Sequence, residues 1–505
     1  MSIKKNVVAN YLGQGCRAVT GLAFIPLYIK YLGIEAYGLI GIFAILQSSL
    51  ALLDLGMKPA LGREMARFTA GAHDSQSIRD LLRSIEVVGI IVSIAIAIGV
   101  WRASGWLTSD WLTTKTLPND VVSGAFSAMG VLIALRFIEN IYVSCIVGLQ
   151  RQVLESMVSC GMAIVRGLGA VGVLAWVSPT LRAFFIWQGI ISLVTVPMLA
   201  SIVYRTLPPY SHSARFSWSA LGGIWRFAGG IMAISVLALS LTQIDKILLS
   251  RLLPLKSFAY YALAGTLASA LYMLAAPVNA AFYPQFTEFT TRGDSEALSR
   301  VYHQAAQLAT VVMGSAAVVL IGFAEVILRL WTGNPDLAEN VSYLLQVLAF
   351  GTLLNGLMGV PYQMQLAHGW TSLTIRINAA AVAVLVPAIF YVAPKYGAIG
   401  AAGLWVTLNV GYLMIDVFFM HRRVLQSEKW RWYGQDVALP LAAAATTTVL
   451  FRWCLPAEMS KIEQVCALIS VSGCAMMAAA LVCPRVRTHL TTNILASFKH
   501  IRPRV

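Results

Sequence analysis

Charged residues are scarce in this 505-residue chain, in which Asp, Glu, Lys and Arg make up 12% of the sequence. An average soluble domain carries about 25%. Because so few charges cannot cover the surface of a globule this large, a soluble cytoplasmic or secreted enzyme is strongly disfavoured. Acidic residues are the scarcer kind, with 22 against 37 basic residues and a formal net charge of +15. This excess indicates either nucleic-acid binding or basic residues at the cytoplasmic ends of membrane helices.

Motifs for catalysis and metal binding are also missing. The sequence has no Walker P-loop, H-E-x-x-H, G-x-S-x-G or metal-spaced histidine cluster, which predicts no catalytic residue, no metal site and no ATP-driven pump. The seven cysteines include no C-x-x-C pair and are expected to be free thiols in apolar surroundings, with no disulfide framework. Gly167, Gly169 and Gly172 spell G-x-G-x-x-G inside an apolar run, which predicts close helix packing rather than a dinucleotide site.

Long apolar runs dominate what is present: 58% of the residues are hydrophobic and the mean hydropathy is +0.73. A bilayer core of about 30 Å needs roughly 20 apolar helical residues. Windows of that length predict an all-α polytopic membrane protein with about fourteen transmembrane helices and short loops. The predicted spans are 7–32, 37–57, 82–105, 121–148, 152–177, 183–204, 227–253, 258–286, 303–331, 341–367, 371–393, 398–420, 436–454 and 464–483.

The positions of the basic residues predict the orientation of these spans. With the N-terminus inside, 23 of the 37 basic residues fall on the cytoplasmic side and nine on the opposite side. This bias predicts that both termini are cytoplasmic and explains most of the net charge without nucleic acid. The remaining five lie within spans and are Arg17, Arg136, Arg166, Lys246 and Arg329.

The first six spans and the next six show ordered matches that indicate an internal duplication. At an offset of 221, Lys30 aligns with Arg251 and Tyr37 with Phe258, and Trp187 aligns with Trp405 at an offset of 218. The duplication predicts two six-helix lobes related by pseudo-two-fold symmetry along the membrane normal, an arrangement used by alternating-access transporters. The predicted organisation is a lobe over 1–205, a cytoplasmic linker over 206–226, a lobe over 227–425, and a helix pair with a basic tail over 426–505.

Arginines within the first lobe are candidate ligands for an anionic group. A charge near the bilayer centre is costly and usually faces the bundle interior. Arg17 lies near the middle of its span with Gln14 about one turn earlier, and Arg166 has no acidic neighbour one turn away on its own helix. Arg136 and Glu139 are spaced i,i+3, so a structural ion pair between them is as reasonable as a functional role. For Arg17 the alternative is a structural ion pair between helices.

The second half supplies fewer charges within its spans. Asp245 and Lys246 are adjacent and point in different directions on a helix, so Asp245 could take a coupling proton or hold Arg17. Asp54 lies i,i+4 from Lys58 at the inner end of the second span, and Asp54 and Glu139 are further candidates for ion coupling or gating. The surplus of arginine predicts a cationic cavity, which suits a lipid diphosphate because guanidinium groups bind phosphate oxygens bidentately.

The eighth span adds neutral polar groups and a candidate hinge. Asn279 and Tyr283 could donate hydrogen bonds to sugar hydroxyls, with interhelical hydrogen bonding as the alternative. Pro277 lies inside the same span and is expected to act as a hinge or as a static kink.

Several short patterns resemble one known family. They are Asn10-Tyr11-Leu12-Gly13-Gln14-Gly15, Pro26-Leu27-Tyr28, Tyr31-Leu32-Gly33, Tyr37-Gly38-Leu39, Asp54-Leu55-Gly56, Arg63-Glu64, Gln243-Ile244-Asp245-Lys246 and Tyr396-Gly397-Ala398-Ile399-Gly400-Ala401-Ala402. Their order over about residues 1–425 resembles polysaccharide transporters of the multidrug/oligosaccharidyl-lipid/polysaccharide (MOP) exporter superfamily, and O-antigen (Wzx-type) flippases in particular.

The resemblance implies a non-enzymatic flippase with a V-shaped cavity lined by spans one, two, seven and eight. It implies translocation of undecaprenyl-diphosphate-linked oligosaccharide from the cytoplasmic to the periplasmic leaflet of a bacterial inner membrane. It places Arg17, Asp54, Asp245 and Lys246 in the cavity. A proton or sodium ion is the expected coupling ion, no other cofactor is expected, and the expected partners are membrane lipids, a polysaccharide polymerase and a chain-length regulator.

Two other functions compete with this prediction. A multidrug antiporter of the same superfamily would favour an acidic cavity for cationic drugs, and the basic excess disfavours it. An O-antigen polymerase or ligase would usually carry a large periplasmic loop, which the spacing of the spans leaves no room for.

Overall fold

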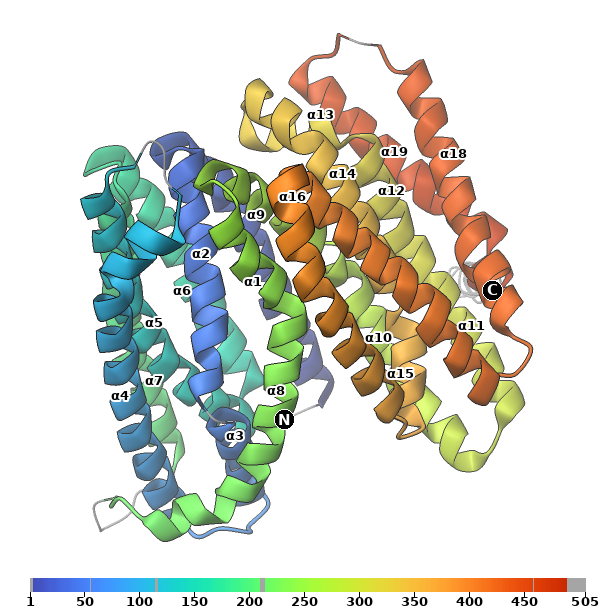
Figure 1. The fold of residues 1–505 in the computed structure, drawn as a ribbon. Coiled ribbons are helices and arrows are strands. Elements are labelled where there is room, and N and C mark those ends of the chain that lie inside the picture. Colours follow the sequence, from blue (N-terminus) through green and yellow to red (C-terminus); the bar gives the residue numbers. More distant parts are fainter. Residues whose placement is uncertain (1–2, 55, 114–116, 209–213, 457, 488–505) are drawn as a thin grey trace, which may run out of the picture. The chain divides into compact units, whose positions relative to one another are not determined.

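The computed structural model describes residues 3–54, 56–113, 117–208, 214–456 and 458–487, and these residues are almost entirely helical (Figure 1). Within them there is no β-strand, only an isolated bridge between Thr113 and Pro254. In lipid every backbone polar group must be satisfied within the chain, and a helix achieves this within one segment. The predicted all-α fold is therefore confirmed.

The helical elements follow one another along the chain with short connections. In chain order they are α1 (Ile3–Leu32), α2 (Ile34–Leu50), η1 (Ala51–Asp54), α3 (Met57–Thr69), α4 (Ser75–Trp106), η2 (Leu107–Trp111), α5 (Asn119–Gly148), α6 (Gln152–Trp176), α7 (Leu181–Thr206), α8 (Trp218–Leu252), α9 (Leu255–Ser269), α10 (Tyr272–Arg292), α11 (Ser295–Ala309), η3 (Thr310–Gly314), α12 (Ser315–Gly322), α13 (Ala324–Thr332), α14 (Pro335–Leu357), α15 (Gly359–Ala367), α16 (Ser372–Arg423), α17 (Lys429–Arg431), η4 (Trp432–Ala438), α18 (Leu439–Cys454) and α19 (Lys461–Val482).

Eleven stretches of the described chain are helical, long enough and apolar enough to cross a membrane. They correspond in order to predicted spans, and α1 and α8 cover the predicted first and seventh spans. One difference concerns α16, whose 52 residues join the predicted spans 371–393 and 398–420. Gly397 interrupts this helix with a left-handed φ of 62°, a conformation that costs glycine little. The polytopic architecture is confirmed, with these two spans meeting at a kink rather than a loop.

The chain divides into two compact units, Met1–Ala259 and Tyr260–Val505. In this division α8 belongs to the first unit, whereas the duplication predicts that it opens the second lobe. The lobes inferred from the duplication stay a prediction, and each unit has its own internal packing.

In the first unit, α1 packs on α6, and α5 packs on both α4 and α7. Glycines allow two of the close approaches. A Cβ built on Gly167 would lie 2.0 Å from the ring of Phe24, and one on Gly169 would lie 2.0 Å from the ring of Trp187. The G-x-G-x-x-G sequence therefore serves helix packing, as predicted, because at two of its glycines an aromatic ring occupies the space of a side chain.

The expectation that every cysteine is a free thiol is wrong for two of the seven. Cys16 on α1 and Cys160 on α6 form a disulfide, with their Cα atoms 6.1 Å apart. The packing of α1 on α6 brings together residues separated by 144 positions in sequence. Cys145, Cys454, Cys466, Cys474 and Cys483 are free.

In the second unit, the terminal helices α18 and α19 pack on each other and on α12 (Figure 1). Their contact surface is made of small and apolar side chains, including Ala444, Val471 and Ala475, all fully buried. The predicted helix pair at the end of the chain is thus an integral part of this unit.

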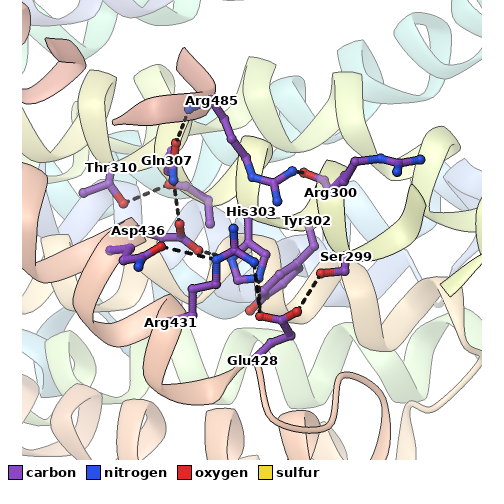
Figure 2. A network of polar contacts seen from close by, with 12 residues as sticks. Ser299, Arg300, Tyr302, His303, Gln307, Thr310, Glu428, Arg431, Asp436 and Arg485 are labelled. Atoms are coloured by element: carbon purple, nitrogen blue, oxygen red, sulfur yellow. Dashed lines mark hydrogen bonds and ion pairs between the residues drawn. The ribbon is translucent and has the colours of Figure 1, made fainter. Parts of the chain in front are cut away.

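A buried polar network ties the same region together (Figure 2). The side chain of His303 on α11 is fully buried, with Nδ1 against the Asp436 carboxylate of η4 and Nε2 3.0 Å from Oε2 of Glu428. Gln307 donates to Asp436 at 2.8 Å and accepts from the backbone N–H of Arg485 at 3.2 Å. These bonds fix α11, η4 and the segment after α19 to one another.

Candidate functional site

A cavity of about 500 Å³ lies inside the first unit, among α1, α2, α5, α6 and α7. Its lining includes three arginines that the sequence places within separate spans, Arg17, Arg136 and Arg166, together with Glu139. It also includes Glu155, which belongs to the first turn of α6. The fold therefore gathers charges from three helices around one space within the membrane-spanning part of the chain.

Arg166 and Glu139 form an ion pair between α6 and α5. Arg166 Nη2 lies 2.6 Å from Glu139 Oε1 and 3.1 Å from the hydroxyl of Ser192 on α7. The pair that the i,i+3 spacing offered, Arg136 with Glu139, is replaced by this one between neighbouring helices. Arg166 thus finds the partner on another helix that its own helix lacks.

Arg17 forms a second ion pair, with Glu155 of α6 at 3.2 Å. Glu155 also accepts a hydrogen bond of 2.7 Å from Ser159, and its side chain is 9% exposed against 34% for Arg17. Cys16, the residue before Arg17, forms a disulfide with Cys160, which links α1 to α6 beside this ion pair. Asp245, offered by the sequence as a partner for Arg17, is not in the cavity lining.

Arg136 differs from the other two arginines because its partners are neutral. It donates to Oε1 of Gln47 at 3.4 Å and to Oε1 of Gln188 at 3.2 Å, and its guanidinium lies 5.5 Å from the ring centre of Phe43. No carboxylate of the described chain forms an ion pair with it. Arg136 is therefore the least neutralised charge of the three.

Two hydrogen-bond donors in this cluster have no acceptor in the part of the chain that the structure describes. The Nε atoms of Arg136 and Arg166 are buried and lack a partner among the residues that the structure describes. Buried donors are nearly always satisfied in folded proteins, so each such exception calls for an explanation. An anionic ligand in the cavity would supply the missing acceptors.

The lining residues that were not predicted from the sequence include Glu155, Tyr28, Gln47 and Gln188. Glu155 could have been found, because it is an acidic residue within a predicted span, where charge is rare. Tyr28, Gln47 and Gln188 carry no such signal, because neutral polar side chains are common in spans and only the packing shows which of them face the cavity.

The remaining predicted site residues of the first unit lie outside this cavity. Gln14 is exposed on α1. Asp54 pairs with Lys58 at 3.6 Å, as the i,i+4 spacing predicts, and accepts the backbone N–H of Gly56 at 2.9 Å. Burial lowers the pKa of Lys58 against the opposing effect of Asp54. Asp245 and Lys246 are partly buried on α8.

The predicted residues of the second unit all lie on α10. Asn279 lies against Gly359 of α15, where a built Cβ would come within 2.5 Å of its amide nitrogen. Tyr283 is 38% exposed, and Pro277 lies inside the helix. The structure thus brings Arg17, Arg136, Arg166 and Glu139 into one site. The sugar-binding, hinge and ion-coupling roles suggested for the other residues stay predictions.

Comparison with known proteins gives a match to a family model and similarity to individual sequences. The MatE family model matches residues 231–392. A Shigella flexneri protein named "Putative O-antigen transporter" is 20% identical over 413 residues, which cover 80% of this chain and 94% of that protein. The Arabidopsis thaliana protein DETOXIFICATION 36 is 25% identical over 231 residues, or 44% of this chain and 46% of that protein.

Solved structures with the same fold include the lipid II flippase MurJ in an inward closed conformation. It matches with a TM-score of 0.69 at 13% identity, over 93% of this chain and 98% of that one. An inward-facing multidrug resistance MATE family transporter matches with a TM-score of 0.62 at 14% identity, over 82% and 96% of the two chains. These comparisons show that the chain is a multi-pass membrane protein with the fold of MOP superfamily transporters, and that it is similar in sequence to the MatE family model and to a putative O-antigen transporter.

Proposed function

We propose that this transporter is a flippase for an undecaprenyl-diphosphate-linked oligosaccharide, an O-antigen unit or a related repeat. It carries the lipid from the cytoplasmic to the periplasmic leaflet of a bacterial inner membrane by alternating access, with both chain termini in the cytoplasm. The observation that carries the proposal is the position of Arg136. Its guanidinium lines the cavity with two neutral amide partners and an Nε donor that has no acceptor among the described residues.

The chemistry of a diphosphate suits this arrangement. Desolvating a doubly charged headgroup is costly unless charged donors replace its water, and arginine does so with two parallel hydrogen bonds. Arg136 can bind a phosphate without first breaking an ion pair, whereas Arg17 and Arg166 are paired with Glu155 and Glu139. We therefore assign Arg136 the first contact with the diphosphate, and the other two arginines join by exchanging their carboxylate partners.

The same carboxylates are the candidate site for a coupling ion. A phosphate that displaces Glu139 or Glu155 leaves a carboxylate in a low-dielectric cavity without its arginine. Because an unpaired buried charge is costly, a cation would take the place of the arginine. A proton or a sodium ion is the proposed coupling ion.

The relatives support the lipid substrate, and the cavity disfavours a rival. The names of the Shigella protein and of MurJ refer to O-antigen and to lipid II. A multidrug antiporter for cationic compounds would need free acidic groups, whereas Glu139 and Glu155 are both bound to arginines. Membrane lipids, a polysaccharide polymerase and a chain-length regulator are the proposed partners.

The proposal is tested by reconstituting the purified protein in proteoliposomes with a labelled lipid-linked oligosaccharide in the inner or outer leaflet. We expect translocation of the diphosphate lipid, faster with an imposed proton or sodium gradient, and no accumulation of a quaternary ammonium drug in parallel vesicles. Transport of the drug without movement of the lipid would overturn the flippase in favour of the antiporter.

A further inference from the structure

A second cavity, of about 410 Å³, lies in the other unit where α16 ends and α17 begins. Its walls include Phe418, His421 and Arg422 from α16, Ser427 from the connection, and Lys429 and Trp430 from α17. It shares no residue with the arginine cavity of the first unit. The proposed flippase mechanism makes no use of it.

This second cavity lies at the junction of two candidate membrane spans. The apolar stretch Ser372–Arg423 ends beside it, and the next stretch, Lys429–Cys454, begins beside it. Only residues 424–428 connect the two, and Ser427 in that turn has a positive φ of 72°. Because consecutive spans meet here, the cavity faces the layer in which lipid headgroups lie.

The cavity carries positive charge that no carboxylate neutralises within the described chain. Arg422 is exposed and Lys429 is partly exposed, and neither forms an ion pair there. Glu428 is adjacent to Lys429 in sequence but is bonded to other residues. Ser299 donates to one of its oxygens at 3.0 Å, and His303 and Arg431 contact the other oxygen (Figure 2).

The lowered pKa of Glu428 indicates that this residue is ionised and bonded to the buried network. Its partial burial would raise its pKa, but the hydrogen bond from Ser299 and the neighbouring His303 outweigh burial and lower the pKa overall. Glu428 is therefore an anion that serves the buried network, and it leaves the cationic groups of the cavity available to an external anion.

Aromatic rings place the lysine of this cavity and mark its edge as a membrane interface. The ammonium of Lys429 lies 4.7 Å from the ring centre of Phe418 and 4.6 Å from that of Trp430. Trp430 is 75% exposed, and Phe418 is 38% exposed. Exposed tryptophan next to lysine and arginine is typical of the headgroup level of a bilayer, where one side of the ring meets lipid and the other water.

The inner wall of the cavity is continuous with the buried network. His421 is 2% exposed, and its Nε2 lies 3.2 Å from the hydroxyl of Tyr302, the neighbour of His303. A ligand seated against His421 would therefore contact a side chain that is fixed from behind. Such a rigid wall favours specific binding over a diffuse attraction to the surface.

We propose that this cavity holds the headgroup of an anionic phospholipid, with its phosphate between Arg422 and Lys429. The acyl chains leave past Phe418 and Trp430 into the bilayer. The position between two spans and the exposed rings at the rim indicate a lipid rather than a soluble phosphate. The bound lipid braces the turn that carries the terminal helix pair.

The test measures lipid retention and stability of the full-length protein. Native mass spectrometry after detergent exchange is expected to show phosphatidylglycerol retained in preference to phosphatidylcholine, and phosphatidylglycerol should raise the thermal unfolding midpoint. The double variant Arg422→Gln/Lys429→Gln should bind phosphatidylglycerol about 25-fold more weakly, since each basic residue contributes about a fivefold factor.

The matched control is Arg292→Gln/Arg376→Gln, which removes the same charge from two exposed positions of the same unit and should retain the lipid. Arg422→Lys/Lys429→Arg should also retain it. If the double variant does not fold, each single variant should show about a fivefold loss. Equal retention of both lipids, an unchanged affinity in the charge variants, or equal protection by soluble glycerol phosphate would each overturn the proposal.

Discussion

The arginine cavity of the first unit and the histidine network of the second unit are both built from charged groups inside a helical bundle, yet they differ in how fully their groups are satisfied. In the network, His303 and Asp436 have no exposed side-chain surface, and the Asp436 carboxylate is bonded through both oxygens. In the cavity, two arginine Nε donors lack an acceptor among the described residues, and Arg17 is 34% exposed.

The difference separates a structural use of buried charge from a binding use. A network whose members satisfy one another rigidifies the elements that carry it and has no capacity left for a ligand. A cavity with unsatisfied donors retains that capacity and offers space of about 500 Å³ to use it. A charged residue within a span is therefore not enough to identify a binding site. The feature that identifies the candidate site is the presence of hydrogen-bond donors without acceptors.

The largest effect on stability is expected in the histidine network, from Asp436→Asn. The amide would place an N–H against His303 or Gln307, both of which now bond to the carboxylate. Leaving a buried hydrogen-bonding group of this network without its partner costs about 3 kcal/mol, so the free energy of unfolding in detergent should fall by about that amount. Flipping per folded molecule should be unchanged. The control is Glu296→Gln, which removes one partner of an exposed ion pair. Its free energy of unfolding should differ from that of the wild type by less than about 0.5 kcal/mol.

The next effect is expected in the arginine cavity, from Arg136→Gln. Loss of one charge-assisted contact worth about 1.5–3 kcal/mol should slow flipping by roughly tenfold to a hundredfold. Thermal stability should change little, because Arg136 is bonded to neutral amides. Initial flipping rates in proteoliposomes provide the measurement, with Arg329→Gln, from an exposed pair, as the control. A large loss of stability would instead indicate that Arg136 has a structural role, like the residues of the histidine network.

Much of the fold could be predicted from the sequence, because a bilayer imposes span lengths and leaves few exceptions. Arg17, Arg136 and Arg166 stood out for the same reason, since charge within a span is rare. Their partners could not be predicted. Spacing tests only neighbours on one helix, whereas Arg166 binds Glu139 and Arg17 binds Glu155 across helix contacts.

Two further features could not be predicted from the sequence. The Cys16–Cys160 disulfide joins residues 144 positions apart, and nothing in the cysteine spacing indicates it. Gly397 directly precedes the predicted span 398–420. Its left-handed φ, which turns a loop into a kink within α16, follows from the local backbone and not from composition.

A smaller effect of opposite sign is expected from Glu139→Gln in the cavity. This change frees Arg166 from its carboxylate partner and keeps the shape of the side chain. Substrate should bind about threefold to tenfold more tightly, and turnover should slow by a similar factor because release becomes harder. A binding titration paired with flipping rates separates the two effects. Weaker binding would contradict the partner exchange that we propose.

The smallest effect is a pH dependence outside the spans, at Glu64 on α3. Burial would raise the pKa of Glu64, but the hydrogen bond to His73 and the charge of Arg67 outweigh it and lower the pKa. The stabilisation is therefore present above the unfolded-state pKa of about 4.3 and is lost as the pH falls through the lower folded-state pKa. Because Arg67 is half exposed, less than about 1 kcal/mol is expected. Thermal unfolding between pH 7 and about pH 3 should show a smaller acid loss for Glu64→Gln than for the wild type.

The central claim is that free cationic capacity in the first-unit cavity sets the affinity for the lipid diphosphate. The most direct test is the dissociation constant of one labelled undecaprenyl-diphosphate oligosaccharide for the wild type, Arg136→Gln and Glu139→Gln, measured side by side in the same nanodiscs. We predict that Glu139→Gln binds most tightly, the wild type next and Arg136→Gln most weakly. Equal affinities for all three proteins, or the reverse order, would contradict the claim.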